Sequence, residues 1–218
     1  MTTSHSRTIR SNLIRLAAVS LLPAMLLING CVSQPAVPQD YFYRLPAIHP
    51  ESAVDTKPVN GTIAVDQLDA DGVYRERPIL YVEAQRPLEV LQYHYRHWIQ
   101  IPSQLIQDNL VDYLREANVA DTVERYSSGR GQALLIKGRL HKFERLVETD
   151  HFSAVVKLEI EFRKKTQQEM LKLTKVYESQ VSAQGPTIHD SVTAFGEALQ
   201  QIYAKMLKDL AGMGDKIQ

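Results

Sequence analysis

The stretch VVKLEIEFRKK, residues 155–165, indicates the fold class more clearly than any other part of the chain. Apolar side chains occupy every second position, at Val156, Leu158, Ile160 and Phe162, and charged side chains fill the positions between them. Successive side chains of a strand point to opposite faces of a sheet, so this alternation predicts a strand with one buried and one solvated face. The domain therefore contains a sheet that must bury one face against other elements.

The flanking residues extend this strand into a group of three. Polar residues 164–169 predict a hairpin turn, and residues 170–181 return as the partner strand with less regular alternation. Residues 133–147 (ALLIKGRLHKFERLV) predict another long strand. Within it, Gly138 indicates a bulge or the close approach of another segment.

Two amphipathic helices are predicted. Pro102 suits the first position of one helix, because its missing N–H is not needed there, and apolar residues recur at helical spacing as far as Ala117. A second helix of about twenty residues is predicted near the end of the chain, with Asp190 as its N-cap and Gly212 at its stop. Its apolar stripe consists of Val192, Phe195, Leu199, Ile202, Tyr203, Met206, Leu207 and Leu210.

Shorter strands are interleaved with these elements. They are expected at residues 41–45, 62–65, 78–83 and 90–99, the last two as a hairpin across residues 84–87, with a loop at 47–61 and a turn at 69–72. A chain of 218 residues is of a size for one domain. We therefore expect a single α/β domain with a mixed β-sheet flanked by helices.

Charge is distributed unevenly along the chain. The totals balance, with 25 basic and 25 acidic residues, which argues against a nucleic-acid-binding protein. Residues 1–30 nevertheless contain Arg7, Arg10 and Arg15 and no acidic residue, so the remainder carries 22 basic against 25 acidic side chains. This asymmetry indicates an N-terminal targeting segment followed by a weakly acidic domain.

The first thirty residues have the layout of a secretory signal peptide. A basic segment, 1–15, precedes the apolar stretch LAAVSLLPAMLLI, residues 16–28, and small residues lead into Cys31. An apolar stretch of this length is short for a membrane span, which needs about 20 residues. We therefore expect cleavage before Cys31, which is the only cysteine and so excludes a disulfide framework within the monomer.

The cleavage region LINGC, residues 27–31, resembles the bacterial lipobox, although Asn29 stands where Ala or Ser is usual. The resemblance implies a thioether-linked diacylglycerol on Cys31. Val32 and Ser33 follow in place of the Asp that retains lipoproteins in the inner membrane, which implies the outer membrane, facing the periplasm. Residues 31–40 would be the lipidated cysteine and a proline-containing tether, whose nine residues after Cys31 reach at most about 30 Å. The alternative is an incidental cysteine in an ordinary signal peptide.

No pattern of catalytic or metal-binding residues stands out. His94 and His97 are the closest histidine pair, but positions three apart on a strand point to opposite faces. The glycines near Ser127 form a bare G-x-G without a following helix, and neither HExxH, paired zinc cysteines nor G-x-S-x-G is present. We therefore expect neither an enzyme nor a bound cofactor or metal, apart from the covalent lipid.

Two clusters could form a partner or lipid surface. The aromatic stretch around Tyr93, Tyr95, Arg96 and Trp98 either packs in the core or presents interface anchors of the kinds common at binding surfaces. The basic run Arg163, Lys164 and Lys165 either forms a solvated turn that discourages edge pairing or contacts anionic lipid headgroups.

The ordered set of features resembles the PqiC/YmbA-type family of ABC-transport auxiliary lipoproteins. After the lipobox come YFYRL (41–45) in place of the family's Tyr-x-Leu start, IAV (63–65), RPILY (77–81), YRHWI (95–99) before the Pro102 helix, a strand ending at Phe143-Glu144, and the C-terminal helix. The resemblance covers residues 31–210. The family domain would occupy 41–212, leaving 213–218 as a tail.

This resemblance implies a fold similar to the TolB N-terminal domain, in three layers, and no catalytic residues. It implies a periplasmic partner of MCE-domain membrane proteins, which move phospholipid between the two membranes and support envelope integrity. A homo-oligomer is an open expectation, since a conduit with ring symmetry favours a ring of this protein. The alternative is a lipoprotein that activates a cell-wall synthase, although the short tether is unsuited to crossing the cell-wall mesh.

Overall fold

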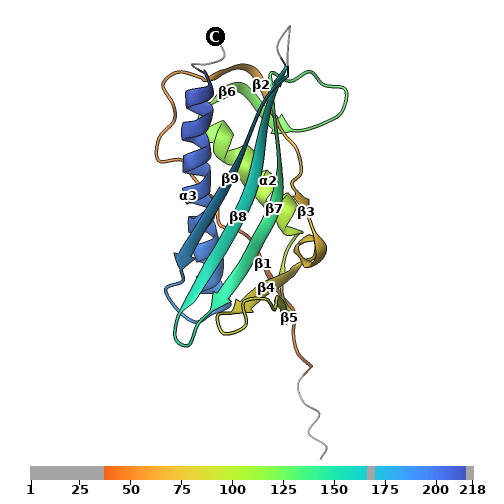
Figure 1. Cartoon of the computed structure of the whole chain (residues 1–218), viewed down its shortest axis with the longest axis vertical. Coiled ribbons are helices and arrows are strands. Elements are labelled where there is room, and N and C mark those ends of the chain that lie inside the picture. The colour runs from red at the N-terminus through yellow and green to blue at the C-terminus, as the bar shows by residue number, and fades with distance from the viewer. Residues whose placement is uncertain (1–36, 166–169, 215–218) are drawn as a thin grey trace, which may run out of the picture. The chain divides into compact units, whose positions relative to one another are not determined.

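A computed structural model describes residues 37–165 and 170–214 of the chain (Figure 1). Contacts divide the chain into Met1–Pro38 and Gln39–Gln218, and the fold is that of the second unit. The predicted signal peptide, Cys31 and most of the tether lie outside the described residues, as do the centre of the 164–169 turn and the last four residues.

The described residues of this unit form nine strands, one short 3₁₀ helix and two α-helices. In chain order they are β1 (Tyr41–Tyr43), β2 (Val59–Val65), β3 (Asp69–Ala70), η1 (Gly72–Arg75), β4 (Pro78–Glu83), β5 (Leu91–Trp98), α2 (Pro102–Glu116), β6 (Ala120–Arg125), β7 (Leu134–Val147), β8 (Phe152–Lys165), β9 (Met170–Ser182) and α3 (Ile188–Gly214). The predicted α/β domain with a mixed sheet and helices is confirmed.

The sheet is organised around β7. One edge of β7 pairs with β8 along almost its whole length, antiparallel, and β8 pairs in turn with β9. The other edge pairs successively with β2, β3 and β4, all parallel. From there one branch continues to β6 and the other through β5 to β1. The sheet therefore divides into two arms beside its three long strands, and β1 ends one of them.

The alternation that predicted β8 is confirmed. Val156, Leu158, Ile160 and Phe162 are each at most 1% exposed. The predicted close approach at Gly138 is also confirmed, because a Cβ built there would lie 2.8 Å from the carbonyl oxygen of Glu159. The bulge in β7 lies further along, between Leu140 and Lys142.

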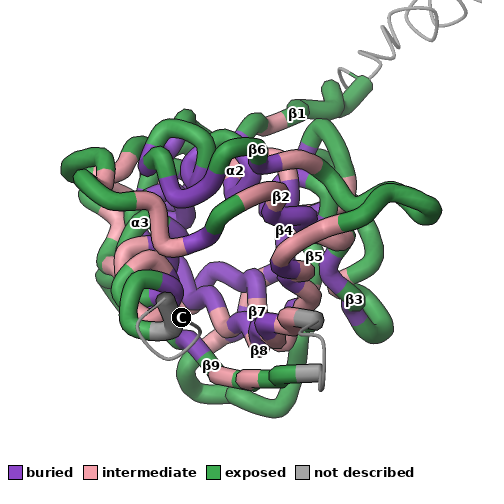
Figure 2. Tube along the Cα trace, turned by 90° about the horizontal axis from the view of Figure 1, so that it is seen from above, coloured by how far each residue is buried: buried purple, intermediate pink, exposed green. Residues whose placement is uncertain are grey.

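The two helices close the open side of the curled sheet (Figure 2). Helix α3 packs along β8 and β9, and α2 packs against β6. The Tyr113 and Tyr203 rings, with centroids 5.2 Å apart, join the two helices, and the Tyr203 hydroxyl donates to the Ile106 carbonyl at 3.1 Å. Apolar side chains of both helices and the sheet form one continuous core.

The predicted ends of the last helix are wrong. Helix α3 begins at Ile188 and continues through Gly212. Thr187 occupies the capping position, because its Oγ1 accepts from the Asp190 N–H at 3.1 Å and the Asp190 carboxylate accepts from the Thr187 N–H at 3.0 Å. Asp190 is thus the acidic partner of a reciprocal capping pair.

Three other local predictions need correction. Strand β6 was not predicted, because it buries only Ala120 and Val123. The loop expected at 47–61 ends earlier, since β2 already begins at Val59 and passes an irregular register at Gly61, whose φ of +104° favours glycine. The turn expected at 69–72 is instead the short strand β3 followed by η1.

Candidate functional site

Strand β1 is the first element after the predicted tether, and it lies at one edge of the sheet. Strand β1 has three residues and pairs parallel to β5, with Tyr41 opposite Arg96 and Phe42 opposite His97. The Ile99 N–H also donates to the Tyr43 carbonyl at 2.8 Å. Pro46 follows shortly after, so the chain leaves the sheet and β1 remains an edge strand.

Three aromatic side chains are exposed on these two strands. Tyr41 is 45% exposed, Phe42 54% and Tyr95 46%. Tyr41 lies on one face of the sheet, and Phe42 and Tyr95 lie on the other, as their register and alternation require. The edge therefore presents aromatic surface on both of its sides.

Arginines accompany these rings. The Arg96 guanidinium lies 4.0 Å from the centroid of Tyr41, and that of Arg77 lies 5.1 Å from the centroid of Phe42. Main-chain carbonyls help to hold both, since Arg96 donates to Tyr95 at 3.2 Å and Arg77 to Trp98 at 3.1 Å. We name Tyr41, Phe42, Arg77, Tyr95 and Arg96 the β1–β5 edge patch.

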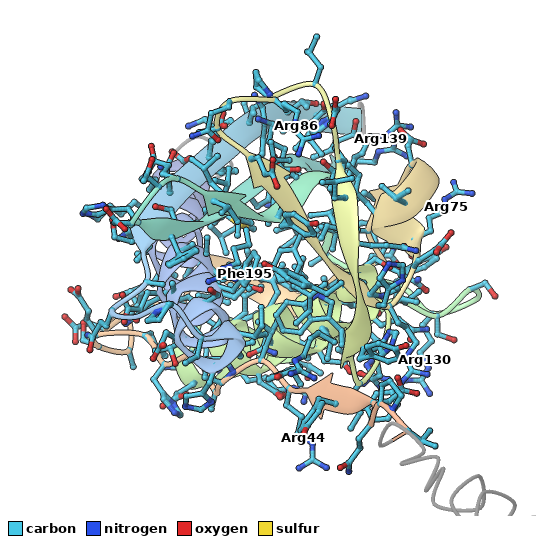
Figure 3. All side chains as sticks on the ribbon, turned by 90° about the horizontal axis from the view of Figure 1, so that it is seen from below. Arg44, Arg75, Arg86, Arg130, Arg139 and Phe195 are labelled. Atoms are coloured by element: carbon cyan, nitrogen blue, oxygen red, sulfur yellow. The ribbon has the colours of Figure 1, made fainter. Side chains whose placement is uncertain are left out.

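The patch and the adjacent Arg44 carry a local positive charge. Among residues 37–165 and 170–214, no carboxylate lies within 4.0 Å of the guanidinium groups of Arg44, Arg77 or Arg96. The nearby acid is Asp40, whose Oδ1 lies 3.5 Å from Nε2 of His97. Figure 3 shows Arg44 beside β1 and pointing away from the domain. The patch can therefore bind an anionic group without displacing an intramolecular ion pair.

The structure separates the four residues of the aromatic stretch that sequence analysis proposed as a surface. Tyr95 and Arg96 belong to the patch. Tyr93 is half-buried against Tyr81, with centroids 4.5 Å apart, and its hydroxyl accepts from Arg145 at 2.7 Å. Trp98 has no exposed surface, so its proposed place in a binding surface is wrong, because it packs against aromatic rings of the core.

The basic run lies elsewhere. In Figure 1 the end of β8 and the start of β9 lie at the top, and β1 lies in the lower half. Arg163 and Lys172 face each other across this hairpin and both bind the Glu161 carboxylate. Lys164 is partly exposed, and the Lys165 side chain lies outside the described residues. Part of the positive charge of this cluster is thus neutralised by Glu161.

Three members of the patch were not singled out from the sequence. Tyr41 and Phe42 were assigned to an ordinary strand, and Arg77 was noted only beside Pro78. This short strand follows the tether directly and is closely followed by Pro46, and that context was the available signal for an exposed edge.

A second feature is a charged cavity of about 790 Å³ lined by residues 66–70 and by residues of β7 and β8, among them Lys137, Gly138, Arg139 and Glu159. Its charged groups are largely paired, either with one another or with Asp71 and His141, which lie outside the lining. Lys137 lies 3.4 Å from Asp66, Arg139 lies 3.3 Å from Asp71, and His141 lies 3.0 Å from Glu159. These pairs give the cavity a structural explanation that requires no ligand.

Arg145 is the most deeply buried cation described. It is 4% exposed, its guanidinium lies 4.0 Å from the Phe152 centroid, and it donates to the Pro186 carbonyl at 2.5 Å. Through this hydrogen bond, Arg145 on β7 holds the loop before α3 against the sheet. In the described part of the chain there is no group of three His, Cys, Asp or Glu side chains placed to hold a metal, and no helix is long and apolar enough to span a bilayer.

Comparisons with known proteins support the fold. No protein-family model matches the chain, and no curated protein matches it. Among solved structures, the domain is similar to protein XCC0632 from Xanthomonas campestris, of family DUF330, with a TM-score of 0.68 and 15% identity over 82% of this chain and 100% of that one. It is also similar to an uncharacterized protein, with a TM-score of 0.62 and 14% identity over 79% of this chain and 99% of that one. At these identities the likeness shows a shared fold across the whole length of both relatives.

Proposed function

We propose that this chain is an outer-membrane-anchored periplasmic lipoprotein and an auxiliary subunit of an MCE-type intermembrane phospholipid transport system that supports envelope integrity. It would hold one end of the lipid conduit at the membrane. Its role would be to bind and tether, with no catalysis and no cofactor apart from the lipid on Cys31.

The observation that carries this proposal is the fold. XCC0632 belongs to family DUF330, which is PqiC/YmbA-like, and the present domain matches its entire length. The sequence resemblance to the same family follows the chain in order from Cys31 to residue 210. Two independent comparisons, one of motif order and one of backbone, thus favour the same family.

The second candidate is a lipoprotein that activates a cell-wall synthase. Its support is a small α/β domain on a lipidated tether, which is an architecture that both functions share. The tether argues against it, because nine residues reach at most about 30 Å. The described domain itself begins at β1, so residues beyond Asp40 are not available to lengthen that reach.

Affinity purification of the full-length lipoprotein from detergent-solubilised envelope distinguishes the two. Mass spectrometry of proteins and lipids should identify an MCE-domain protein together with phospholipid. Recovery of a peptidoglycan synthase without phospholipid would favour the activator instead. The Cys31→Ser variant is a useful control, because a partner that binds the domain directly is still recovered after the anchor is lost.

The same preparation tests the proposed oligomer. Native mass spectrometry of the purified lipoprotein measures the number of copies directly. A closed ring gives one dominant species of several subunits, whereas a monomer would require the conduit to recruit single copies.

A further inference from the structure

We infer that the β1–β5 edge patch lies in the headgroup layer of the bilayer that holds the lipid on Cys31. The domain would therefore rest on its own membrane by this edge. The inference rests on the lipid anchor of the proposed function, and it adds an orientation and a ligand class, phospholipid headgroups, which the anchor alone does not specify.

The first argument is reach. Tyr41 is the first residue of the sheet, and nine residues separate it from Cys31. Even fully extended, this segment spans at most about 30 Å, which is about the thickness of one hydrocarbon core. Among the elements of the domain, β1 has the shortest chain connection to the anchor, so the edge that contains it is held nearest to the membrane surface.

The second argument is the chemistry of the exposed groups. Tyr41 and Tyr95 combine an apolar ring with a hydroxyl, and such amphipathic rings are enriched at membrane–water interfaces. Phe42 is apolar throughout and more than half exposed, which is unfavourable in water. In the headgroup layer, the ring of Phe42 could enter the acyl boundary while the tyrosine hydroxyls remain hydrated.

The third argument is the free positive charge. Arg44, Arg77 and Arg96 lack carboxylate partners among the described residues, and the last two lie against the exposed rings. A guanidinium binds phosphate oxygens in a bidentate manner. Arginine beside an aromatic ring is therefore suited to a surface at which phosphates lie directly above acyl chains.

A membrane suits this patch better than a protein partner does. Three exposed rings, two on the three-residue strand β1 and one on β5, offer little of the roughly 800 Å² that each partner buries in a standard interface. The edge is also too short for an added strand to gain many main-chain hydrogen bonds. A bilayer requires neither a large matching surface nor strand register.

The experiment uses the full-length lipidated protein in vesicles of phosphatidylethanolamine and phosphatidylglycerol. Lipidation occupies the sulfur of Cys31, so one introduced cysteine can carry a fluorophore. Phe42→Cys and Tyr95→Cys report on the patch. Val176→Cys on β9 is the matched control, since Val176 is also on a strand and 55% exposed but belongs to another edge of the sheet.

We expect spin-labelled phospholipid to quench the fluorophores at 42 and 95 several-fold more strongly than the one at 176. Aqueous iodide should give the reverse order. Equal quenching by lipid at all three positions would overturn the inference. Patch labels that are shielded only in native envelope, and not in vesicles, would also overturn it and would assign the patch to a protein partner.

Two controls make the result interpretable. Each labelled variant should keep the melting temperature of the parent protein, and Arg44→Cys, beside the patch, replaces any patch variant that does not. The vesicles contain no MCE-domain protein, so lipid contact of the patch is measured independently of partner recovery. Failure of the inference and failure of the proposed function therefore give different results.

Discussion

The Trp98 indole meets the Phe195 ring edge-on, with centroids 5.4 Å apart and planes at 79°. Phe143 completes the group, 4.4 Å from Phe195 and 5.1 Å from Trp98. This contact joins β5 to α3 through the centre of the core. Tyr95 lies three residues before Trp98 on the same strand, so the packing that fixes Trp98 also fixes the position of the edge patch.

Trp98→Ala should lower the free energy of unfolding by about 3–5 kcal/mol, because it removes a fully buried ring and leaves a cavity between Phe143 and Phe195. Chemical denaturation measures the change. Tyr95→Ala is the matched control, with an expected effect within about 0.5 kcal/mol, because Tyr95 is exposed on the same strand. Similar losses in both variants would contradict the assignment of Trp98 to the core and Tyr95 to the surface.

The contrast between Trp98 and Val156 shows what sequence could and could not predict. The burial of Val156 was predictable, because apolar and charged residues alternate strictly on its strand and only one register buries the apolar set. The strand around Trp98 carries aromatic or long polar side chains on both faces, so alternation does not reveal which one enters the core. Burial there depends on helix α3, which lies about a hundred residues further along the chain.

The start of α3 shows a similar limit. Thr187 and Asp190 are both acceptable capping residues, and local preference alone does not choose between them. Pro186 precedes Thr187 and its carbonyl is held by Arg145, which positions Thr187 to cap. Likewise, the candidate patch depended on which strand ends the sheet, and strand order is set by pairing across distant segments.

Thr187→Ala should destabilise the domain by about 1 kcal/mol, because it removes the hydroxyl that accepts from the Asp190 N–H. The Thr187 hydroxyl and N–H also lower the pKa of the Asp190 carboxyl through their hydrogen bonds, and this lowering should diminish in the variant. Thermal melts at neutral pH measure the loss of stability.

Thr193→Ala is the matched control for this prediction. Thr193 lies within the same helix, exposed, and its hydroxyl bonds only to the His189 carbonyl. Alanine is a better helix former than threonine, so this variant should be neutral or slightly stabilising. A loss at position 193 that equals the loss at 187 would show that the hydroxyl of Thr187 has no special capping role.

Gly138→Ala should cost about 1–3 kcal/mol, because the added methyl group would meet the Glu159 carbonyl and the Ile160 side chain, each at 2.8 Å. Part of that contact is backbone of the neighbouring strand, which cannot move without disturbing the β7–β8 pairing. Gly131→Ala is the control, since nothing lies within 4 Å of its added methyl. Equal melting temperatures for the two variants would argue against the close approach of the two strands.

Stability should fall in acid partly through Asp209 on α3. Burial raises the pKa of this carboxyl, but hydrogen bonds from Lys175 at 2.5 Å and Tyr177 at 2.7 Å outweigh burial and hold the pKa below its ordinary value. The folded state therefore binds the proton more weakly than the unfolded state. The resulting stabilisation is complete above the unfolded pKa of about 3.9 and is lost as pH falls through the lower folded value.

Asp209→Asn tests this linkage. The variant should be less stable than the parent at pH 7, and the difference should shrink between about pH 4 and pH 2, where the parent loses the contribution of its carboxylate. Denaturation curves at several pH values measure both quantities. Asp112→Asn, at an exposed position of α2, is the control and should leave the stability at pH 7 within about 0.5 kcal/mol of the parent. A constant difference between Asp209→Asn and the parent across this range would exclude the proposed coupling.

The last prediction concerns the attachment of the protein to its membrane through Cys31. Cys31→Ser removes the sulfur that would carry diacylglycerol, and each buried CH₂ contributes about 0.8 kcal/mol to membrane binding. The variant should therefore leave the membrane fraction after a carbonate wash, whereas the parent stays. The edge patch alone should not retain the variant, because three aromatic rings bury much less apolar surface in the bilayer than two acyl chains do. A Cys31→Ser protein that resists carbonate would assign the anchoring to an uncleaved signal peptide.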